Sequence, residues 1–290
     1  MSPAVLRPIG RTGQRVFPIG LGAMPLSLAG RPAESAAIAV IHAALDEGVV
    51  LIDTADSYCR DEKDYGHNER LIAKALKSHP SGRHAKVATK GGYTRPQGGW
   101  VVDARPDRLR KCCEASLRAL GVETLWLYQL HHPDGRVPFA ESVGALAQLK
   151  QQGKVLHLGL SNVNAEQIAQ AQRIVRIETV QNECNPLATD DFSNGVIASC
   201  GQQGVSYIAY SPMGGHFGHR QQSRNAMLGA IGKAHGVSAY QVALAWLLQA
   251  APHIVPIPGA SKVSSIRDSA KAATLTLTEE EIRRIDALTP

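Results

Sequence analysis

The chain has 290 residues, of which 44% are hydrophobic, 19% charged and 5% aromatic, a composition typical of globular proteins rather than disordered, collagen-like or membrane-spanning ones. The formal net charge of +6 is scattered, with no run of five like charges, so we expect neither nucleic acid nor a membrane as partner. Because the five cysteines have no C-x-x-C spacing and the N-terminus does not resemble a signal peptide, we expect a cytoplasmic protein with reduced thiols.

Short apolar segments recur along the chain and predict eight β-strands. They follow a stretch from residue 6 to 16 in which Gly10 and Gly13 are turn signals. The predicted strands cover residues 18–22, 49–52, 85–89, 125–128, 156–160, 179–181, 205–209 and 253–257. These segments show little polar alternation, which indicates strands that are buried on both faces.

Segments of helical period separate the predicted strands. Apolar residues at spacings of three and four lie between Ile38 and Leu45, between Leu109 and Leu120, and between Phe139 and Leu149. A glycine, Gly48, Gly121 or Gly153, follows each segment. This pattern predicts amphipathic helices that end at a glycine in the left-handed conformation.

The alternation of strands and helices predicts parallel strands joined by right-handed crossovers. Eight such units in 290 residues fit an α/β fold of one (β/α)8 TIM barrel, which we expect to form a single domain over residues 1–290. The alternative is an open doubly wound sheet, which favours G-x-G-x-x-G after its first strand. Here Gly20-Leu21-Gly22 is followed by Pro25 and lacks the third glycine.

Polar residues follow the predicted strands at the end of a barrel where active sites form. Asp53 follows the second strand, with Tyr58 in the next loop, and Lys90 and His131 follow the third and fourth strands. Later strand ends carry Ser161-Asn162, Gln181-Asn182, Tyr210-Ser211 and the segment Gly259 to Ser265. One mouth of the barrel is therefore expected to gather Asp, Tyr, Lys and His side chains.

These four residue types suit proton transfer to a carbonyl oxygen. A tyrosine is a poor acid at neutral pH, but the ammonium group of Lys90 would favour its phenolate, and Asp53 would keep Lys90 protonated. Tyr58 would then serve as general acid while His131 donates a hydrogen bond to the same oxygen. Strand alternation sends His131 and His132 to opposite sides, so only one of them is expected to face the site.

Seven segments resemble the successive motifs of the aldo-keto reductases, in that family's order and spacing. They are Asp53-Thr54-Ala55-Asp56-Ser57-Tyr58, Thr89-Lys90, Leu130-His131-His132-Pro133-Asp134, Gly159-Leu160-Ser161-Asn162, Gln181-Asn182-Glu183, Tyr210-Ser211-Pro212-Met213-Gly214 and Ile257-Pro258-Gly259-Ala260-Ser261. The resemblance extends from about residue 6 to 289. It implies a (β/α)8 barrel with an N-terminal β-hairpin closing the bottom, and NADPH/NADP+ bound across the top.

The resemblance assigns a role to each matching residue. Tyr58 matches the proton donor, Asp53 and Lys90 the pair that sets its pKa, and His131, rather than His132, the histidine that orients the carbonyl. The residues that match cofactor contacts are Ser161, Asn162 and Gln181 at the nicotinamide amide, Tyr210 on the nicotinamide face, Ser211, Met213 and Gly214 at the pyrophosphate, Gly259, Ser261, Lys262 and Ser265 around the 2′-phosphate, and Ser269 at the adenine.

The sequence departs from the family pattern at several positions. Cys59 stands where glycine often follows the catalytic tyrosine, Cys184 where tyrosine is frequent, and Trp126 where aspartate is common. Asp268-Ser269 replaces the usual Glu-Asn pair at the adenine end. The chain ends soon after a predicted helix at 278–288, so the substrate cleft is expected to be open. Its predicted walls are Met24, Trp100 and the loop 215–224.

The function expected from these features is NADPH-dependent reduction of an aldehyde or ketone, with a small carbonyl compound as the only partner and a monomer or weak homo-oligomer as the assembly. The C-terminal half, including Gln241-Val242-Ala243-Leu244-Ala245-Trp246-Leu247-Leu248-Gln249, is similar to bacterial reductases near the pyridoxal reductases. Pyridoxal is therefore a candidate substrate beside aromatic aldehydes, dicarbonyls and sugars. One alternative is an NADP-binding barrel that acts as a redox sensor or regulatory subunit. Another is a metal-dependent hydrolase, but the first strand lacks paired histidines and we expect no metal.

Overall fold

A computed structural model describes residues 4–215 and 225–288. Eight parallel strands form its main sheet, in the order β12-β11-β10-β9-β8-β5-β4-β3. They are β3 (Leu21–Gly22), β4 (Leu51–Asp53), β5 (Lys86–Gly91), β8 (Leu125–Leu130), β9 (Val155–Ser161), β10 (Thr179–Glu183), β11 (Ser206–Tyr210) and β12 (Ile254–Pro256). All eight predicted strands are present, although β5 extends further than predicted, so that Lys90 lies within it.

Backbone contacts join the first strand of the sheet to the last. The Gly20 N–H donates to the carbonyl of Pro256 at 2.9 Å and the Gly22 N–H to that of Pro258 at 3.0 Å. Gly22 and Gly259 form a parallel bridge. A side chain at Gly22 would lie 2.8 Å from the carbonyl oxygen of Ile257, so this close approach requires glycine. The strands therefore close into the predicted barrel.

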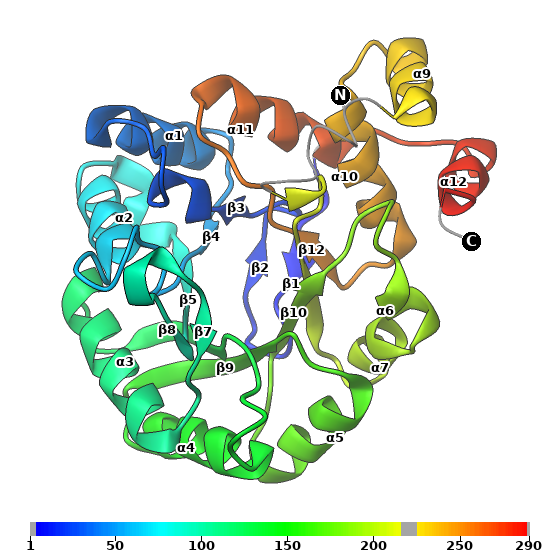
Figure 1. The fold of residues 1–290 in the computed structure, drawn as a ribbon. Helices are drawn as coiled ribbons and strands as arrows, with labels where there is room; N and C mark the ends of the chain where they lie inside the picture. Colours follow the sequence, from blue (N-terminus) through cyan, green and yellow to red (C-terminus); the bar gives the residue numbers. More distant parts are fainter. Residues whose placement is uncertain (1–3, 216–224, 289–290) are drawn as a thin grey trace.

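Helices surround the sheet, as Figure 1 shows. The longer ones are α1 (Glu34–Asp46), α2 (His67–Lys77), α3 (Pro106–Leu120), α4 (Phe139–Gln151), α5 (Ala165–Ile174), α9 (Ala226–His235), α10 (Ala239–Ala250), α11 (Val263–Lys271) and α12 (Glu279–Asp286). The short α6 (Asp190–Ser193) and α7 (Val196–Gln202) follow β10. No helix in these ranges is long and apolar enough to cross a membrane.

Helix α3 shows how local sequence sets an element of the outer layer. Leu109, Cys113 and Leu117 recur at spacings of four and are buried against the barrel. Gly121 follows the last turn with φ of 67°, a conformation that glycine adopts without a steric penalty. The predicted boundaries of this helix are therefore close to the observed ones.

The predicted N-terminal hairpin lies across the bottom of the barrel. Strands β1 (Arg7–Pro8) and β2 (Arg15–Val16) are antiparallel, and the Gly10 N–H between them donates to the hydroxyl of Ser206 at the start of β11. Ile9 and Val16 are buried in one apolar cluster with barrel residues, among them Leu127. Burial of such side chains contributes roughly 1.5–3 kcal/mol each, which holds the hairpin in place.

Candidate active site

A cavity of about 650 Å³ opens at the C-terminal ends of the barrel strands. The predicted site residues that line it are Met24, Asp53, Tyr58, Trp100, His131, Ser161, Asn162, Gln181, Tyr210, Ser211, Met213, Gly259, Ser261, Lys262, Ser265 and Ser269. Lys90 and Gly214 do not line it. Lys90 lies behind Tyr58, and Gly214 completes a turn in which its N–H donates to the carbonyl of Ser211. The predicted 216–224 part of the cleft wall is outside the described residues.

Lys90 is the centre of a buried polar cluster beneath this cavity. Its ammonium group is completely buried and donates to the Tyr58 hydroxyl at 2.9 Å, to Oδ2 of Asp53 at 2.6 Å and to the carbonyl of Thr54 at 2.9 Å. The other oxygen of Asp53 accepts a hydrogen bond from Nε2 of Gln181 at 2.8 Å. Each charge thus has partners within the chain, which a buried ion pair requires.

The electrostatics of Tyr58 differ from the sequence-based expectation. Burial raises the pKa of Tyr58 well above its usual value, and the negative charge of Asp53 raises it further. Burial also lowers the pKa of Lys90, although Asp53 opposes this shift. The net direction is therefore set by burial and by Asp53, while the hydrogen bond from Lys90 to the Tyr58 oxygen is present. Tyr58 remains a protonated phenol, and the Lys90 ammonium remains available as a donor to its oxygen.

The two adjacent histidines occupy different positions. His131 lines the cavity and is only 7% exposed, and burial together with the charge of Lys90 lowers its pKa well below the usual value. It is therefore a neutral imidazole that carries one N–H. His132 does not line the cavity, and its Nδ1 lies 2.7 Å from the carbonyl oxygen of Pro133.

Aromatic rings surround His131 at the wall of the cavity. The ring of Tyr93 packs edge-on against His131, with centroids 4.7 Å apart, and Trp100 lies 5.5 Å from Tyr93. The Arg95 guanidinium stacks on the Trp100 ring at 3.7 Å. Sequence reasoning predicted Trp100 but missed Tyr93, because Tyr93 follows the strand on a short hairpin rather than at the strand end.

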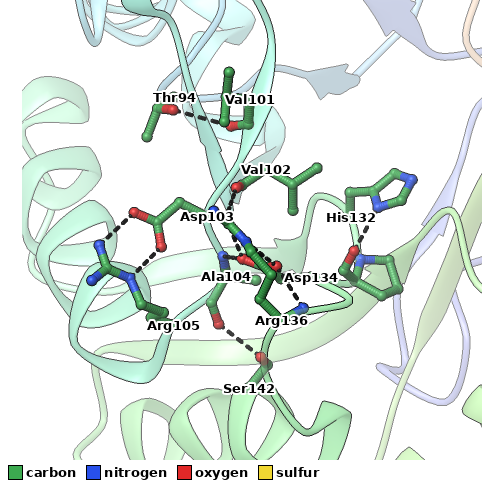
Figure 2. A network of polar contacts seen from close by, with 11 residues as sticks. Thr94, Val101, Val102, Asp103, Ala104, Arg105, His132, Asp134, Arg136 and Ser142 are labelled. Carbon is green, nitrogen blue, oxygen red and sulfur yellow. Dashed lines mark hydrogen bonds and ion pairs between the residues drawn. The ribbon is translucent and has the colours of Figure 1, made fainter.

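This hairpin consists of β6 (Tyr93–Thr94) and β7 (Val101–Val102), and a network of ion pairs anchors it. Figure 2 shows Asp134 and Arg136 beneath it, with the Asp134 carboxylate accepting from the Ala104 N–H and from Arg136, which also donates to the carbonyl of Val102. Arg136 lowers the pKa of Asp134 to about 2, so the carboxylate remains charged. The network fixes the hairpin that carries the aromatic wall.

The strand ends β9 to β11 present connected polar side chains. Asn162, with φ of 60°, donates through Nδ2 to the carbonyl of His131 at 2.9 Å and accepts at Oδ1 from the Tyr210 hydroxyl at 2.8 Å. Because Gln181 donates its Nε2 to Asp53, its carbonyl oxygen is the atom left for a ligand amide. These contacts hold the rim of the cavity in one arrangement.

The far end of the cavity lies at the N-terminus of α11. Lys262 occupies the N-cap position without a side-chain cap, and Ser261 and Lys262 are exposed while Ser265 is half-buried. Free N–H groups, hydroxyls and a cation at a helix N-terminus suit a phosphate group. Asp268, nearby, accepts from Ser238 at 2.7 Å and from Gln241, and therefore joins α11 to α10.

The residues present fit a dinucleotide in donor chemistry and in extent. One continuous cavity joins the side-chain amides of Asn162 and Gln181 to the helix N-terminus at Lys262, which suits a phosphate. Its volume falls within the range of ligand pockets. The wall also includes residues that sequence reasoning missed: Pro25, Leu28, Ala29, Gly30 and Tyr240. No charge or motif in the sequence singled these residues out.

The two cysteines that depart from the family pattern do not disturb the geometry of the candidate site. Cys59 and Cys184 are buried, and burial raises the pKa of each thiol to about 12. Such thiols are unreactive at neutral pH. Trp126 packs beside the apolar cluster inside the barrel and contacts the ring of His157.

The comparisons with known proteins agree with this barrel. The aldo/keto reductase family model matches residues 18–290. The chain is 35% identical to a 6-dehydroglucose reductase of Novosphingobium aromaticivorans, over 93% of this chain and 90% of that protein. It is also 35% identical to a pyridoxine 4-dehydrogenase of Escherichia coli, over 93% and 94% of the two chains.

A solved structure supports the fold independently. An aldo/keto reductase from Klebsiella pneumoniae, in complex with NADP and acetate, aligns with a TM-score of 0.82 at 24% identity, covering 97% of this chain and 94% of that one. The fold and the family match identify a barrel oxidoreductase, of a class that uses a nicotinamide cofactor. The chain belongs to the aldo/keto reductase family.

Proposed function

We propose that the protein reduces aldehydes or ketones to alcohols with NADPH, and that Tyr58 is the general acid. The observation that carries the proposal is the Tyr58 hydroxyl in the cavity wall, 2.9 Å from the ammonium group of Lys90, which Asp53 holds in turn. The names of the two relatives, a 6-dehydroglucose reductase and a pyridoxine 4-dehydrogenase, support a reaction between a carbonyl compound and an alcohol.

The residues that would hold the cofactor lie along the cavity. Ser161, Asn162 and the carbonyl oxygen of Gln181 would bind the nicotinamide amide, with Tyr210 beside the ring. Ser211, Met213 and Gly214 would lie at the pyrophosphate, and Gly259, Ser261, Lys262, Ser265 and Ser269 at the adenosine phosphate and adenine. When bound, NADPH supplies the hydride.

His131 and Tyr58 act on the substrate oxygen. Neutral His131 donates its single N–H to the carbonyl oxygen, which orients it and stabilises the negative charge that develops there. Tyr58 transfers its hydroxyl proton to the same oxygen. The phenolate that remains accepts the hydrogen bond from Lys90, which compensates for the high pKa that burial imposes on the free phenol.

The shape of the substrate end favours a flat or aromatic carbonyl compound. Trp100, Tyr93 and Met24 form its apolar wall, and Trp100 is 43% exposed, so the cleft is open on that side. We therefore rank pyridoxal and aromatic aldehydes above dicarbonyls and small sugars as substrates.

The experiment that tests the function is a panel of these aldehydes, with NADPH oxidation followed by absorbance, for the wild type and for Tyr58→Phe. The Phe variant is expected to lose about 10²–10⁴ in turnover while it still binds NADPH, as for the loss of a general acid. Tyr93→Phe is the matched control, since it removes a hydroxyl from the same wall without touching Lys90.

Two results would contradict the proposal. Turnover of the Phe variant above a third of the wild-type value, with chemistry rate-limiting, would exclude Tyr58 as the acid. Tight NADPH binding without turnover of any aldehyde in the panel would favour a redox sensor instead.

A further inference from the structure

A single arginine joins the aromatic wall of the cavity to the loop that carries Tyr58. Arg95 follows β6 and is only 5% exposed. Its Nη2 donates to the carbonyl of Gly98 at 2.8 Å and to that of Arg60 at 3.3 Å. Its backbone N–H donates to the hydroxyl of Tyr65 at 2.6 Å. Arg95 therefore contacts both the β6–β7 hairpin and the segment that follows Tyr58.

The guanidinium group of Arg95 also covers the ring of Trp100. It lies 3.7 Å from the centroid of that ring, which is a close cation–π contact. Nε and Nη1 of Arg95 are buried and have no hydrogen-bond partner in the part of the chain that the structure describes. The indole ring is therefore a main partner of this buried charge, and the two side chains fix each other.

The turn that precedes Trp100 is docked on the same segment. Gln97, with φ of 49°, donates its N–H to the carboxylate of Glu62 at 2.7 Å. A side chain at Gly98 would lie 3.0 Å from the carbonyl oxygen of Arg60, an approach that favours glycine. Non-glycine residues with positive φ are uncommon, so contacts of this kind are needed to hold the turn in its conformation. The tip of the hairpin is therefore fixed, and the position of Trp100 with it.

Trp100 lies beside the two residues that are proposed to act on the carbonyl oxygen. The centroid of its ring is 6.4 Å from that of Tyr58 and 6.4 Å from that of His131, with interplanar angles of 76° and 74°. It lines the cavity and is partly exposed. A partly exposed indole next to the proton donor is a surface on which a flat substrate can pack.

We propose that Arg95 is a positioning residue that determines substrate specificity: by stacking on Trp100 it fixes the indole as a wall beside Tyr58 and His131, which favours planar, conjugated carbonyl compounds over small aliphatic ones. This inference rests on the proposed reductase function. A wall that is ordered beforehand loses little conformational entropy on binding, so its contact with a flat substrate adds to the affinity. A small aliphatic aldehyde covers little of the indole and gains little from its order.

Steady-state kinetics with benzaldehyde and propanal, with NADPH as reductant, test the proposal. We expect Arg95→Gln to raise the KM for benzaldehyde about tenfold and to leave its kcat within about twofold, because the wall loses its order while Tyr58 keeps its proton. Both constants for propanal should stay within about twofold of the wild-type values, which also shows that the variant is folded.

Further variants separate positioning from general damage. Trp100→Ala should raise the KM for benzaldehyde by a similar factor, and the double variant Arg95→Gln, Trp100→Ala should add less than about twofold, since both changes remove the same wall. Trp100→Phe keeps a flat ring under the guanidinium and should retain most of the preference for benzaldehyde. Arg95→Lys keeps the charge but lacks the planar group, so it should raise the KM for benzaldehyde about threefold.

The matched control is Arg105→Gln. It removes an exposed arginine just after the hairpin that pairs with Asp103, and it should leave the kinetics of both aldehydes unchanged.

Acrylamide quenching of tryptophan fluorescence gives a readout that does not depend on turnover. The chain has three tryptophans, so the signal of Trp100 is the difference between each protein and the same protein with Trp100→Ala. We expect the quenching constant of Trp100 to rise about twofold in Arg95→Gln, because the guanidinium no longer covers the ring.

The results that would overturn the role of Arg95 differ from the one that would overturn the reductase function. Equal losses for benzaldehyde and propanal, additive losses in the double variant, wild-type selectivity in Arg95→Lys, or a loss in Arg105→Gln would each overturn the role of Arg95. A wild type that reduces neither aldehyde would overturn the reductase function instead. Quenching decides the positioning of Trp100 in that case too, and an unchanged quenching constant in Arg95→Gln would exclude it.

Discussion

Two neighbouring regions of the barrel place buried carboxylates in opposite electrostatic situations, although Asp53 and Asp56 are three residues apart. Asp53 has both oxygens satisfied from within the chain, by Lys90 and Gln181. Asp56 and Glu69 form no ion pair among the described residues, and their hydrogen bonds come from neutral groups, among them Ser57 and Thr89. The fold thus uses one carboxylate as a fixed charge and surrounds the other two with neutral donors.

The difference teaches how burial decides the role of a charge. Desolvation raises the pKa of all three carboxyls. At Asp53 the ammonium of Lys90, at 2.6 Å, opposes that shift, so the pair supports a proton donor in the cavity above it. Asp56 and Glu69 form no ion pair within 4.0 Å among the described residues, so no ion pair opposes the rise in the pKa of their carboxyl groups.

Breaking the ion pair at Asp53 should have the largest effect. Lys90→Met leaves the buried Asp53 carboxylate without its cation, which should cost about 3–5 kcal/mol of unfolding free energy at pH 7. Denaturant unfolding measures this. The double variant Asp53→Asn, Lys90→Met should recover most of the lost unfolding free energy. A Lys90→Met protein as stable as the wild type would show that the ion pair does not stabilise the fold.

Replacing each of the two adjacent histidines by alanine should show which of them donates a hydrogen bond in the active site. His131→Ala is expected to lower turnover by about 10²–10³, the usual cost of losing a hydrogen bond to a developing oxyanion. His132→Ala should change turnover little, because its ring does not line the cavity. Steady-state kinetics on one aldehyde decides the point, and equal losses in both variants would refute the assignment of His131.

Stability should depend on pH through the buried Glu69. Its pKa of about 7 in the folded state exceeds the ordinary 4.5, so the folded state holds the proton more tightly. The contribution of Glu69 to the unfolding free energy is fully present below about pH 4.5 and is lost as the pH rises through 7. Glu69→Gln removes this dependence, so its stability relative to the wild type should rise by up to about 3 kcal/mol between pH 5 and pH 8.

The control for this measurement is Glu166→Gln, at an exposed position of α5. Its stability relative to the wild type should stay constant over the same pH range. A Glu69→Gln profile parallel to that of the wild type would mean that Glu69 is not held protonated by burial.

The exposed end of the active-site cavity should show the smallest effect. Lys262→Ala is expected to weaken NADPH about tenfold, with NADH nearly unchanged, because an exposed lysine makes a single charge-assisted contact. Salt should reduce this preference. Titration of both cofactors against both proteins measures it, and equal losses for NADPH and NADH would exclude Lys262 from the 2′-phosphate.

The sequence alone was sufficient to predict the barrel and the residues around its mouth. Eight apolar segments and glycine-terminated helices such as α3 are set by local patterns, and parallel order then places Asp53, His131 and Ser161 at one end. The motif order also predicted that Lys262 lies at the same cavity, because helix α11 follows the last strand.

Only the tertiary structure decided how these groups behave. Burial raises the pKa of Tyr58 against the expected effect of Lys90, since desolvation depends on every element packed around the phenol. Tyr93 and Leu28 reach the cavity through loop geometry that no periodic pattern encodes. Packing of α2 against α3 brings Glu69 to Ser116 from a segment about fifty residues away, and pairings between distant segments are set by packing rather than by local sequence.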